Sequence, residues 1–599
     1  MGVNVAADPL FTAAYTGVGG GMVILAADDP GMYSSQNEQD SHYYAQAAAI
    51  PCLDPADSAE ALRFTREAYD ISERFDVPVI IRSSVRISHT KTPVEAGERA
   101  EAPARPYEKN PAKWVMMPAF AKPRRLVQLD RIDKLRQWVE TCPYNEVIEG
   151  KGTVGVVCAG AAYQHVAEAL PDASIFKLGV TWPLPAAALR DFADSVEAVY
   201  VVEEGSEYLK DAVRACGVPV SDTPCPLPRA GELSPGLVRA AFGLEQPSHA
   251  PAATDLPGRP PALCPGCPHR LVFKELSRMR AIVTGDIGCY TLGALPPLSA
   301  MDTTVDMGAS VSMAHGFELA LAGTEHRPIV AVIGDSTFAH SGLSSLISTV
   351  YNRGAGTVCV LDNSPTAMTG GQPHPGTGNT LMGSKSAPLS IECVLEALGV
   401  ECIEFANPHH LDESIDAVTK AVSFEGPSAV IFRAPCVNLI KPEAPVSINA
   451  EICTGCKKCI TAIGCPAIGF NGEVATIDET LCTGCGLCVH ACHEGAIGLA
   501  DGKARLLRDD YCDGLGDCLP ACPENAIEFI EREAAAYDEA AVIAEKMRRA
   551  QAETHASMPA GGCPGSMAKT IVREVEPGVV SESGQAAPAH GVNLSLIHI

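Results

Sequence analysis

The chain has 599 residues, 46% of them hydrophobic and 20% charged, a composition that builds packed cores and excludes wholesale disorder. At roughly 150 residues per domain, this length predicts about four domains. The 72 acidic and 45 basic residues leave a net charge of −27 without a basic cluster, which excludes a nucleic-acid partner.

One long uncharged run, residues 10–27, is a candidate membrane span. Four glycines interrupt it, Asp8 and Asp28 flank it, and the first basic residue of the chain is Arg63. A signal peptide needs a basic start, and a membrane helix usually carries basic residues on one flank. We therefore expect a buried strand with a glycine turn, no membrane association and a cytoplasmic protein.

Alternating apolar segments and helical patterns predict α/β layers up to about residue 440. The expected strands are residues 22–27, 77–81, 153–157, 174–178, 198–202, 328–333 and 357–361. The expected helices include residues 59–75, 311–321 and 341–351. The last two strands and the helix between them have the spacing of a right-handed parallel crossover. Proline-bearing stretches at 91–123 and 247–265 are expected to be linkers.

The cysteines are concentrated at one end, since 12 of the 24 lie after residue 450 at short, repeated spacings. In a large chain without secretion signals, such spacings indicate metal rather than disulfides. Two runs have the two-cluster ferredoxin spacing, in which the fourth cysteine of each run serves the other cluster. The predicted [4Fe–4S] ligands are Cys453, Cys456, Cys459 and Cys492 for one cluster, and Cys465, Cys482, Cys485 and Cys488 for the other. Zinc ribbons are the alternative, but their cysteine pairs usually stand farther apart.

A third, incomplete cysteine unit follows. It contains Cys512, Cys518 and Cys522, and Leu515 stands where the second ligand is expected. Three outcomes stay open: a [3Fe–4S] cluster, a fourth ligand from Cys563, or a repeat that binds no cluster. All three units end in Ala-Ile, which marks them as internal repeats.

Polar residues follow two neighbouring predicted strands of the third region. Asp335, between Gly334 and Ser336, ends one strand, and Asn363 ends the next. The carboxyl ends of parallel strands meet at one sheet edge, where ligands bind. Mg²⁺ prefers oxygen ligands together with phosphate oxygens, so these two side chains and a carbonyl near Pro365 predict a magnesium–diphosphate site.

The residues that open the predicted helix 311–321 add to this site. They are Gly308, Ala309 and Ser310, and the amino end of a helix attracts a diphosphate. Alone, Gly-Asp-Ser is a weak pattern that more often marks a plain turn. The combination of strand ends and helix start favours the diphosphate site.

Five motifs occur in a fixed order in this region. They are Cys264-Pro-Gly-Cys267-Pro-His269, Gly285-Asp-Ile-Gly-Cys289-Tyr-Thr-Leu-Gly293, Gly334-Asp-Ser with Asp362-Asn, Thr366-Ala-Met-Thr-Gly-Gly-Gln372 and Arg433-Ala-Pro-Cys436. They resemble the thiamine-diphosphate domain of the 2-oxoacid:ferredoxin oxidoreductases, most closely the large (alpha) subunits that act on indolepyruvate. Gly2-Val-Asn-Val-Ala-Ala-Asp8-Pro9 and Asp28-Asp-Pro-Gly-Met-Tyr-Ser34-Ser-Gln-Asn-Glu-Gln-Asp40 resemble the pyrimidine-binding domain of the same subunits.

The resemblance covers about residues 1–500 and implies a multidomain α/β chain of doubly wound parallel-sheet domains with a small α+β ferredoxin-like domain. The expected domains are a partial pyrimidine-binding domain (1–123), a transketolase-C-terminal-like domain (124–247), a diphosphate- and Mg-binding domain (255–445), a 4Fe-4S domain (447–530), and a helix with a low-complexity tail (531–599).

The resemblance also implies cofactors and their ligands. Thiamine diphosphate and Mg²⁺ are expected at Gly308, Ala309, Ser310, Gly334, Asp335, Ser336, Asn363, Thr369 and Gly370, with Asp335 and Asn363 on the metal. A proximal [4Fe–4S] cluster is expected on Cys264, Cys267, Cys289 and Cys436. His269 and His315 are candidates for steering the substrate, with a structural role as the alternative. The other eight cysteines, Cys402 among them, show no cluster spacing and are expected to be ordinary thiols.

One expected residue has no counterpart. Members of this family begin farther upstream, with a glutamate that activates the thiamine ring, whereas this chain starts at Met1 inside the matching domain. Glu38 is the nearest acid in a matching motif, but the family does not use that position for activation. The catalytic glutamate stays unassigned. We expect an incomplete start; the alternatives are that another chain supplies the missing part or that this chain is not competent alone.

The resemblance implies oxidative decarboxylation of an aryl 2-oxo acid, indolepyruvate, to the acyl-coenzyme A with release of CO₂. Thiamine supplies the electron sink, and the clusters carry the electrons to ferredoxin. A smaller beta subunit in a hetero-oligomer is the implied partner. The alternatives are the same chemistry on pyruvate or 2-oxoglutarate, and a non-catalytic electron carrier. A decarboxylase without redox function ranks last because it leaves eight cysteines unexplained.

Overall fold

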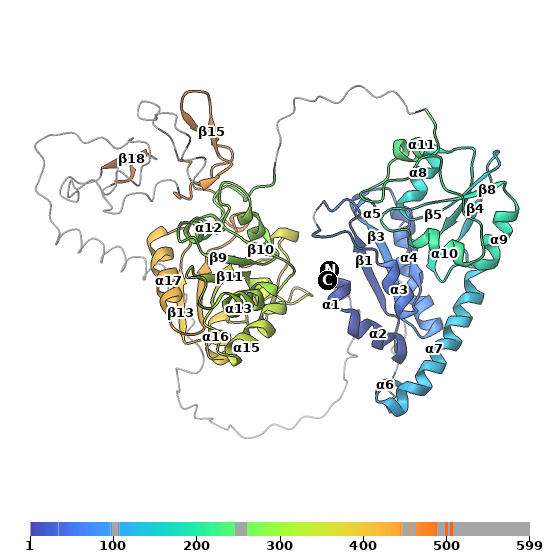
Figure 1. Cartoon of the computed structure of the whole chain (residues 1–599), viewed down its shortest axis with the longest axis horizontal. Coiled ribbons are helices and arrows are strands. Elements are labelled where there is room, and N and C mark those ends of the chain that lie inside the picture. Colours follow the sequence, from blue (N-terminus) through green and yellow to red (C-terminus); the bar gives the residue numbers. More distant parts are fainter. Residues whose placement is uncertain are drawn as a thin grey trace, which may run out of the picture. The chain divides into compact units, whose positions relative to one another are not determined.

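The computed structural model describes most of the first 487 residues and two later hairpin strands. The described residues are 2–33, 35–95, 97–98, 106, 108–245, 260–443, 445–446, 448, 457, 460, 463–487, 497–500 and 503–506. They belong to two compact units, one within Met1–Thr254 and one within Asp255–Val575 (Figure 1). Among the helices so described, none has the length and apolar content needed to cross a membrane.

The first sheet of the first unit has the strand order β1-β3-β2-β7. Its strands are β1 (Val23–Asp28), β3 (Val79–Ser84), β2 (Cys52–Leu53) and β7 (Val180–Trp182). The first three are parallel, and β7 runs antiparallel to β2. Because β7 comes from beyond residue 124, the chain returns to complete the sheet that its first hundred residues begin.

The sequence around helix α4 (Ser58–Phe75) shows how this layer forms. Asp57 caps the helix by accepting a hydrogen bond from the Glu60 amide at 2.8 Å. Apolar side chains recur on one face at helical spacing and are buried against the sheet; they are Phe64, Ala68, Ile71 and Phe75. The shorter helices of this region are α1 (Gly2–Val5), α2 (Ala7–Thr16), α3 (His42–Ala48) and α5 (Val85–His89).

Two stretches differ from the sequence-based expectation. The uncharged run 10–27 ends in the expected glycine turn and strand, β1, but its first part lies in helix α2, which was not expected and which Gly17, at φ 74°, ends. The expected linker 91–123 contains α6 (Pro111–Trp114) and the start of α7 (Pro118–Val139). Both helices open on a proline, and the first helical position needs no amide donor, so proline starts helices there instead of breaking them.

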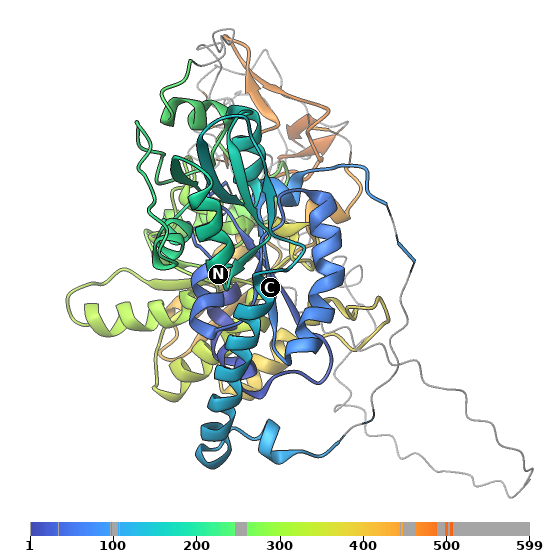
Figure 2. The same cartoon turned by 90° about the vertical axis from the view of Figure 1, so that its right-hand side faces the viewer.

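The second sheet of this unit has the order β4-β6-β5-β8. Its strands are β4 (Glu146–Ile148), β6 (Ser174–Leu178), β5 (Val154–Ala159) and β8 (Ala198–Val202), parallel except for β4. Helices α8 (Ala161–Ala169) and α11 (Pro235–Ala241) cover one face, and α9 (Ala186–Asp194) and α10 (Tyr208–Ala215) cover the other. The long helix α7, blue-green in Figure 2, packs on α2 and α4.

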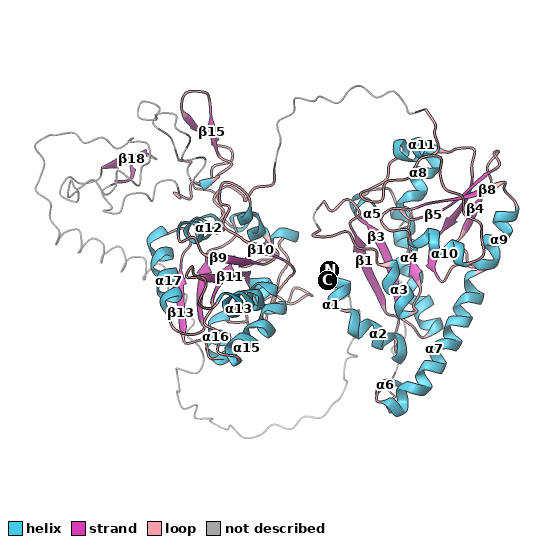
Figure 3. Ribbon diagram, viewed as in Figure 1, coloured by secondary structure: helices cyan, strands magenta, loops and turns pink. Residues whose placement is uncertain are grey.

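The second unit contains a six-stranded parallel sheet of order β10-β9-β11-β12-β14-β13 (Figure 3). Its strands are β9 (Ile282–Gly285), β10 (Thr303–Thr304), β11 (Ile329–Gly334), β12 (Thr357–Asp362), β13 (Cys402–Ala406) and β14 (Ser428–Arg433). Alternate side chains of β11 face opposite cores, Val330 and Val332 one and Ala331 and Ile333 the other. Helices therefore cover both faces, which confirms the doubly wound fold.

The helices of this unit sort by face. Helices α12 (His269–Arg278) and α17 (Leu411–Ser423) lie on one side, and α13 (Ala309–Leu321), α15 (Leu343–Tyr351) and α16 (Ile391–Leu398) on the other. Short helical turns connect them: η1 (Cys289–Ala294), α14 (Asp335–Thr337), η2 (Phe338–Gly342), η3 (Ala367–Thr369), η4 (Pro375–Thr377) and η5 (Val437–Leu439).

After this sheet the chain forms two small antiparallel hairpins. One joins β15 (Ile468–Phe470) to β16 (Ala475–Ile477), and the other joins β17 (Ile497–Ala500) to β18 (Lys503–Leu506). Several predicted ligands lie outside the described residues: Cys453, Cys456, Cys459, Cys488, Cys492, Cys512, Cys518, Cys522 and Cys563. The expected helix after residue 530 lies outside them too.

Candidate active site

Three neighbouring strands of the second unit end in polar residues at one edge of the sheet. Asp335 follows β11 and Asn363 follows β12, and their exposed fractions are only 4% and 8%. The Asp335 carboxylate accepts hydrogen bonds from the backbone amides of Ser336 (2.7 Å), Asn363 (3.1 Å) and Ser364 (2.9 Å). The structure thus brings together the two residues predicted to hold Mg²⁺, with Gly334 and Ser336 beside them.

The third strand end supplies Asp286, which sequence reasoning named only as part of a motif. It follows β9 and is completely buried, and burial raises its pKa to about 6. Its Oδ2 accepts hydrogen bonds from the Gly308 amide at 2.7 Å and the Ser310 hydroxyl at 3.1 Å. Asp286 therefore holds the amino end of α13 at this edge.

Position 308 requires a glycine. Its φ is 95°, and a Cβ there would lie 2.4 Å from the Ser341 hydroxyl oxygen. Only glycine lets the chain turn into α13 at this close approach. The predicted diphosphate-binding residues Gly308, Ala309 and Ser310 consequently stand at a helix start that the fold holds in place.

The loop after β12 carries Thr369 and Gly370 and is tied back to the same edge. The Thr366 hydroxyl donates to the Ser336 hydroxyl at 2.9 Å, and the Thr366 amide donates to the Gln372 carbonyl at 3.0 Å. Thr369 in turn donates to the Gln372 side-chain oxygen at 2.6 Å. This loop is therefore a small closed turn anchored beside Asp335.

The two histidine candidates separate. His269 is buried at the start of α12, with its Nε2 3.4 Å from the Asn363 side-chain nitrogen, and burial lowers its pKa to about 4. His315 instead contacts Glu318 at 3.3 Å and lies against Gly354, which precedes β12. The structure places His269 at the site and His315 toward the opposite ends of the strands.

A third histidine, His374, was missed by sequence reasoning. Its Nδ1 accepts a hydrogen bond from the Gly376 amide at 3.2 Å, so the neutral ring carries its proton on Nε2. That nitrogen lies 3.4 Å from Asp335 Oδ2, yet it makes no well-formed hydrogen bond within the described residues. The sequence carried no signal for it beyond its place two residues after Gln372.

These residues fit a diphosphate held through Mg²⁺. Asp335 and Asn363 offer the oxygen atoms that the metal prefers, and the start of α13 offers a helix amino end. His374 adds a buried ring nitrogen that lies 3.4 Å from Asp335 Oδ2 and makes no well-formed hydrogen bond within the described residues. Buried polar atoms usually have a partner, so this nitrogen is available to a ligand at the site.

The four cysteines predicted to bind a proximal cluster lie beside this edge. The Cys267 amide donates to the Cys264 carbonyl at 3.1 Å, and the Cys436 amide donates to the Asn363 carbonyl at 3.0 Å. Burial, and then the neighbouring Cys264 and Cys436 thiols, raise the pKa of Cys289. The thiols therefore lie within electrostatic reach of one another. As placed, no three metal-ligating side chains of the described residues are close enough to hold a metal ion, so cluster binding stays a prediction.

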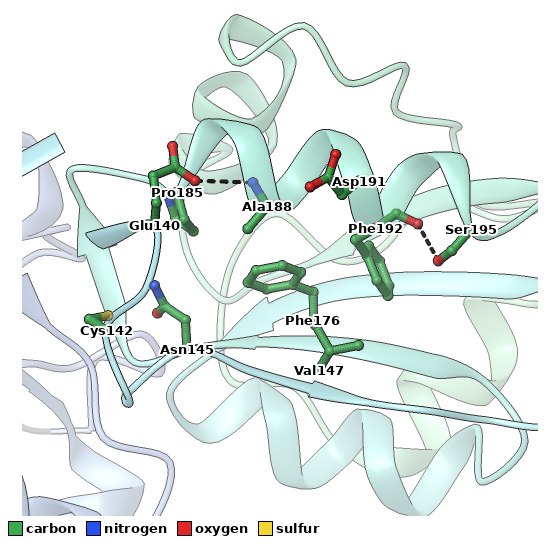
Figure 4. A pocket seen from close by; sticks show the side chains of 10 residues that line it. All are labelled: Glu140, Cys142, Asn145, Val147, Phe176, Pro185, Ala188, Asp191, Phe192 and Ser195. Atoms are coloured by element: carbon green, nitrogen blue, oxygen red, sulfur yellow. Dashed lines mark hydrogen bonds between the residues drawn. The ribbon is translucent and has the colours of Figure 1, made fainter. Parts of the chain in front are cut away.

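The first unit contains a cavity of about 400 Å³ between α9 and the second sheet (Figure 4). Phe176 and Phe192 form its apolar wall, and Glu140 lies at one end. The Glu140 carboxylate accepts hydrogen bonds from the Ala187 and Ala188 amides at 3.0 Å, so it caps α9. None of the predicted site residues lines this cavity.

Residues of the first unit's opening motif lie in a buried ionic network. Arg82 contacts Asp28 at 2.7 Å and Asp54 at 3.1 Å, and His42 contacts Asp40 at 2.6 Å. Glu38 accepts a hydrogen bond from the Gly231 amide at 3.4 Å. The motif is thus largely occupied with contacts inside its own unit.

Comparisons with known proteins match two parts of the chain to families. Residues 286–432 match the C-terminal TPP-binding domain of thiamine pyrophosphate enzymes, and residues 474–523 match the 4Fe-4S dicluster domain. The first range holds Asp286, Asp335 and Asn363. The second includes the incomplete third cysteine unit.

Relatives match over most of the length. The indolepyruvate oxidoreductase subunit IorA of Methanothermobacter marburgensis is 39% identical over 527 residues, which cover 83% of this chain and 84% of the relative. The IorA subunit of Archaeoglobus fulgidus is 37% identical over 529 residues, with the same coverage of 83% and 84%. That of Pyrococcus horikoshii is 38% identical over 525 residues, covering 79% and 81%.

Proposed function

Because this chain belongs to the family of indolepyruvate oxidoreductase IorA subunits, we propose that it is the thiamine-dependent, iron–sulfur subunit of an enzyme that oxidatively decarboxylates indolepyruvate. The reaction yields CO₂ and the acyl-coenzyme A, and the electrons pass to ferredoxin. The matched thiamine pyrophosphate and 4Fe-4S domains support both halves of this chemistry.

The observation that carries the proposal is the direct link between the two predicted centres. Asn363 is a predicted Mg²⁺ ligand and Cys436 is a predicted cluster ligand. The backbone amide of Cys436 donates a hydrogen bond to the backbone carbonyl of Asn363. His269 joins them on the other side, since it follows Cys267 by two residues and contacts the Asn363 side chain. A cofactor anchored at Asp335 would therefore react close to the cysteines predicted to hold the cluster that accepts its electrons.

Each residue has a separable task in this proposal. Asp335 and Asn363 hold Mg²⁺, the start of α13 receives the diphosphate, and Asp286 holds that helix start in place. When bound, thiamine diphosphate supplies the carbanion and the electron sink for loss of CO₂. His269, kept neutral by burial, orients the Asn363 side chain.

The relatives are named as subunits, which supports assembly with another chain. We infer a hetero-oligomer with a smaller beta subunit, with ferredoxin as the electron acceptor. The aryl side chain of the substrate rests on the relatives' names.

The test is viologen reduction by the anaerobically purified complex with Mg²⁺, thiamine diphosphate and coenzyme A. Indolepyruvate and other arylpyruvates should reduce the dye, and pyruvate and 2-oxoglutarate should not. Asp335→Asn should lower the rate about 100-fold or more because it removes charge from the metal site. Glu396→Gln, on the exposed face of α16, is the matched control and should leave the rate unchanged.

Two outcomes would contradict the proposal. Reduction with pyruvate or 2-oxoglutarate alone would move the substrate to another member of the wider family. Full iron content without reduction by any of these acids would favour a non-catalytic electron carrier.

A further inference from the structure

We propose that Arg270 is the positioning residue through which electrons cross from the thiamine-binding domain to the ferredoxin-like module. It joins the Cys264–Cys267 loop to the loop that carries Cys465, and its charge favours the reduced form of both adjoining clusters. The inference rests on the proposed function, because it takes clusters to be bound on both sides.

The side chain of Arg270 makes the connection by itself. It is the second residue of α12 and only 2% exposed. Its Nε donates to the Cys264 carbonyl at 3.1 Å, and a terminal nitrogen donates to the Leu263 carbonyl. The other terminal nitrogen donates to the carbonyls of Ile463 (3.0 Å) and Gly464 (2.7 Å). One guanidinium therefore holds two loops that lie almost two hundred residues apart in the chain.

The packing around this bridge is close. A Cβ on Gly266, which has φ 69°, would collide with the Thr483 hydroxyl, and it would lie 3.5 Å from the Cys485 Cβ. A Cβ on Gly464, which has φ 63°, would lie 2.6 Å from Pro297. Glycine on each side of the junction thus lets the cysteine loops of domain and module approach one another.

The charge of Arg270 is unusual for a buried arginine. No carboxylate of the described residues forms an ion pair with it, and its partners are neutral carbonyl oxygens. Arg270 lines a small cavity together with Cys465, Cys482 and Cys485, and it hydrogen-bonds the carbonyl of Cys264. A buried cation needs a nearby negative charge to offset its desolvation. Thiolate-ligated clusters would supply that charge on both sides.

The electron step is simple to balance. One electron leaves the cluster on Cys264, Cys267, Cys289 and Cys436, which is oxidised, and reduces the cluster on Cys465, Cys482, Cys485 and Cys488. No bond is formed or broken, and no proton moves. Because each added electron makes a cluster more negative, a fixed buried cation between them raises both reduction potentials.

The experiment compares Arg270→Met and Arg270→Lys with Arg278→Met in the complete complex. Arg278 lies on the same helix, but it is exposed and paired with Glu275. Iron and sulfide content, redox titration and the electron paramagnetic resonance spectrum of the reduced protein are measured. In Arg270→Met we expect unchanged iron, weaker magnetic coupling between clusters, and a potential lowered enough to change the reduction equilibrium about tenfold.

The lysine variant separates charge from geometry. Arg270→Lys keeps the charge but lacks the donors that reach both loops, so the potential should be largely restored while the coupling stays weak. Arg278→Met should match the parent protein in every readout. If Arg270→Met fails to fold, the lysine variant alone decides the proposal through its coupling.

Unchanged coupling and potential in an Arg270 variant with full iron would overturn the proposal. Failure of the proposed function looks different. If the parent complex has no more iron than the ferredoxin-like module requires, the proximal cluster is absent and there is no junction for Arg270 to serve.

Discussion

Arg82 in the first unit and Arg270 in the second are both buried, and their charges are balanced in opposite ways. In the first unit Arg82, 6% exposed, contacts the carboxylates of Asp28 at 2.7 Å, Asp54 at 3.1 Å and Asp40 at 3.7 Å. In the described part of the second unit, Arg270 donates its hydrogen bonds to carbonyl oxygens, and it lines a small cavity together with Cys465, Cys482 and Cys485. The charge of Arg82 is balanced by protein carboxylates. The charge of Arg270 has no such partner among the described residues, and in our proposal bound clusters balance it.

The balanced network also connects the layers of the first unit. The Ser206 hydroxyl donates to Asp40, and the ring of His42 stacks on Tyr208 with centroids 4.7 Å apart. Residues 206 and 208 follow β8 of the second sheet, whereas Asp40 and His42 belong to the region of the first. A buried ionic network whose charges are all paired, such as the one around Arg82, stabilises the fold. A buried charge without a charged partner, such as Arg270, is a candidate for a functional site.

The largest effect is expected in the second unit, from removing Cys436, a predicted ligand of the proximal cluster. Cys436→Ala should remove about four irons per chain and abolish indolepyruvate-dependent dye reduction, because a proximal cluster loses a ligand. Cys402→Ala, at a thiol without cluster spacing, is the control. Iron analysis of both variants checks this prediction, and equal iron in the two would contradict it.

Removing Arg82 from the ionic network of the first unit should lower the stability of that unit instead. Arg82→Met removes the cation that three buried carboxylates share and leaves Asp28 without an ion-pair partner among the described residues, so we expect a loss of about 3–5 kcal/mol in the free energy of unfolding of the first unit. Arg86→Met removes a half-exposed ion pair with Glu232 and should cost no more than about 1 kcal/mol. Denaturant titration compares them. Similar losses in both variants would argue that Arg82 is not a special site.

The stability of the first unit should also depend on pH, because His42 belongs to the ionic network around Arg82. Burial and the Arg82 charge lower the pKa of His42, but Asp40 and Asp54 outweigh them and raise it from 6.5 to about 9. The protonated ring therefore contributes stability that is complete below about pH 6.5 and is lost as the pH rises through 9, on the order of 1–3 kcal/mol. His42→Phe keeps the stacking on Tyr208 and should remove this slope from unfolding measured between pH 6 and 10. A slope that persists in the variant would assign it to other groups.

The smallest effect is expected at His374, which lies beside Asp335 in the second unit. His374→Leu removes the Nε2 donor next to Asp335, so thiamine diphosphate should bind about tenfold more weakly in the presence of Mg²⁺. Calorimetric titration of the complex measures this directly, and the exposed His326→Leu is the control. Equal affinity in the two variants would remove His374 from the cofactor site.

Much of the framework was predictable from local patterns. Strands β6 and β8 begin and end at the predicted residues, and β1, β3, β5, β11 and β12 lie within three residues of prediction. Continuous apolar runs between helical segments report such buried strands directly. The prediction did not include helix α2 or the strands β2, β4, β7, β9, β10, β13 and β14, several of which are only two to four residues long. It also took the stretch of α6 and α7 for a linker, although each of these helices begins at a proline.

The site was predictable to the extent that strand ends converge. Asp335 and Asn363 follow adjacent parallel strands, so their meeting is a consequence of sheet geometry. Asp286 follows a third strand and could have been found by the same argument. His374 and His315 could not be sorted in advance, because a loop conformation and a position along a helix decide which of them reaches Asp335.

By itself the sequence determined the α/β framework, the cysteine spacings and the family, because these are recorded in patterns that span a few residues or in the order of motifs. Only the tertiary structure decided which charges are satisfied. Arg82 finds Asp28 54 residues away, and Arg270 finds Ile463 193 residues away. No local pattern carries such contacts, since they depend on where whole layers and loops come to rest. The same folding that pairs one arginine with aspartates leaves the other facing cysteines.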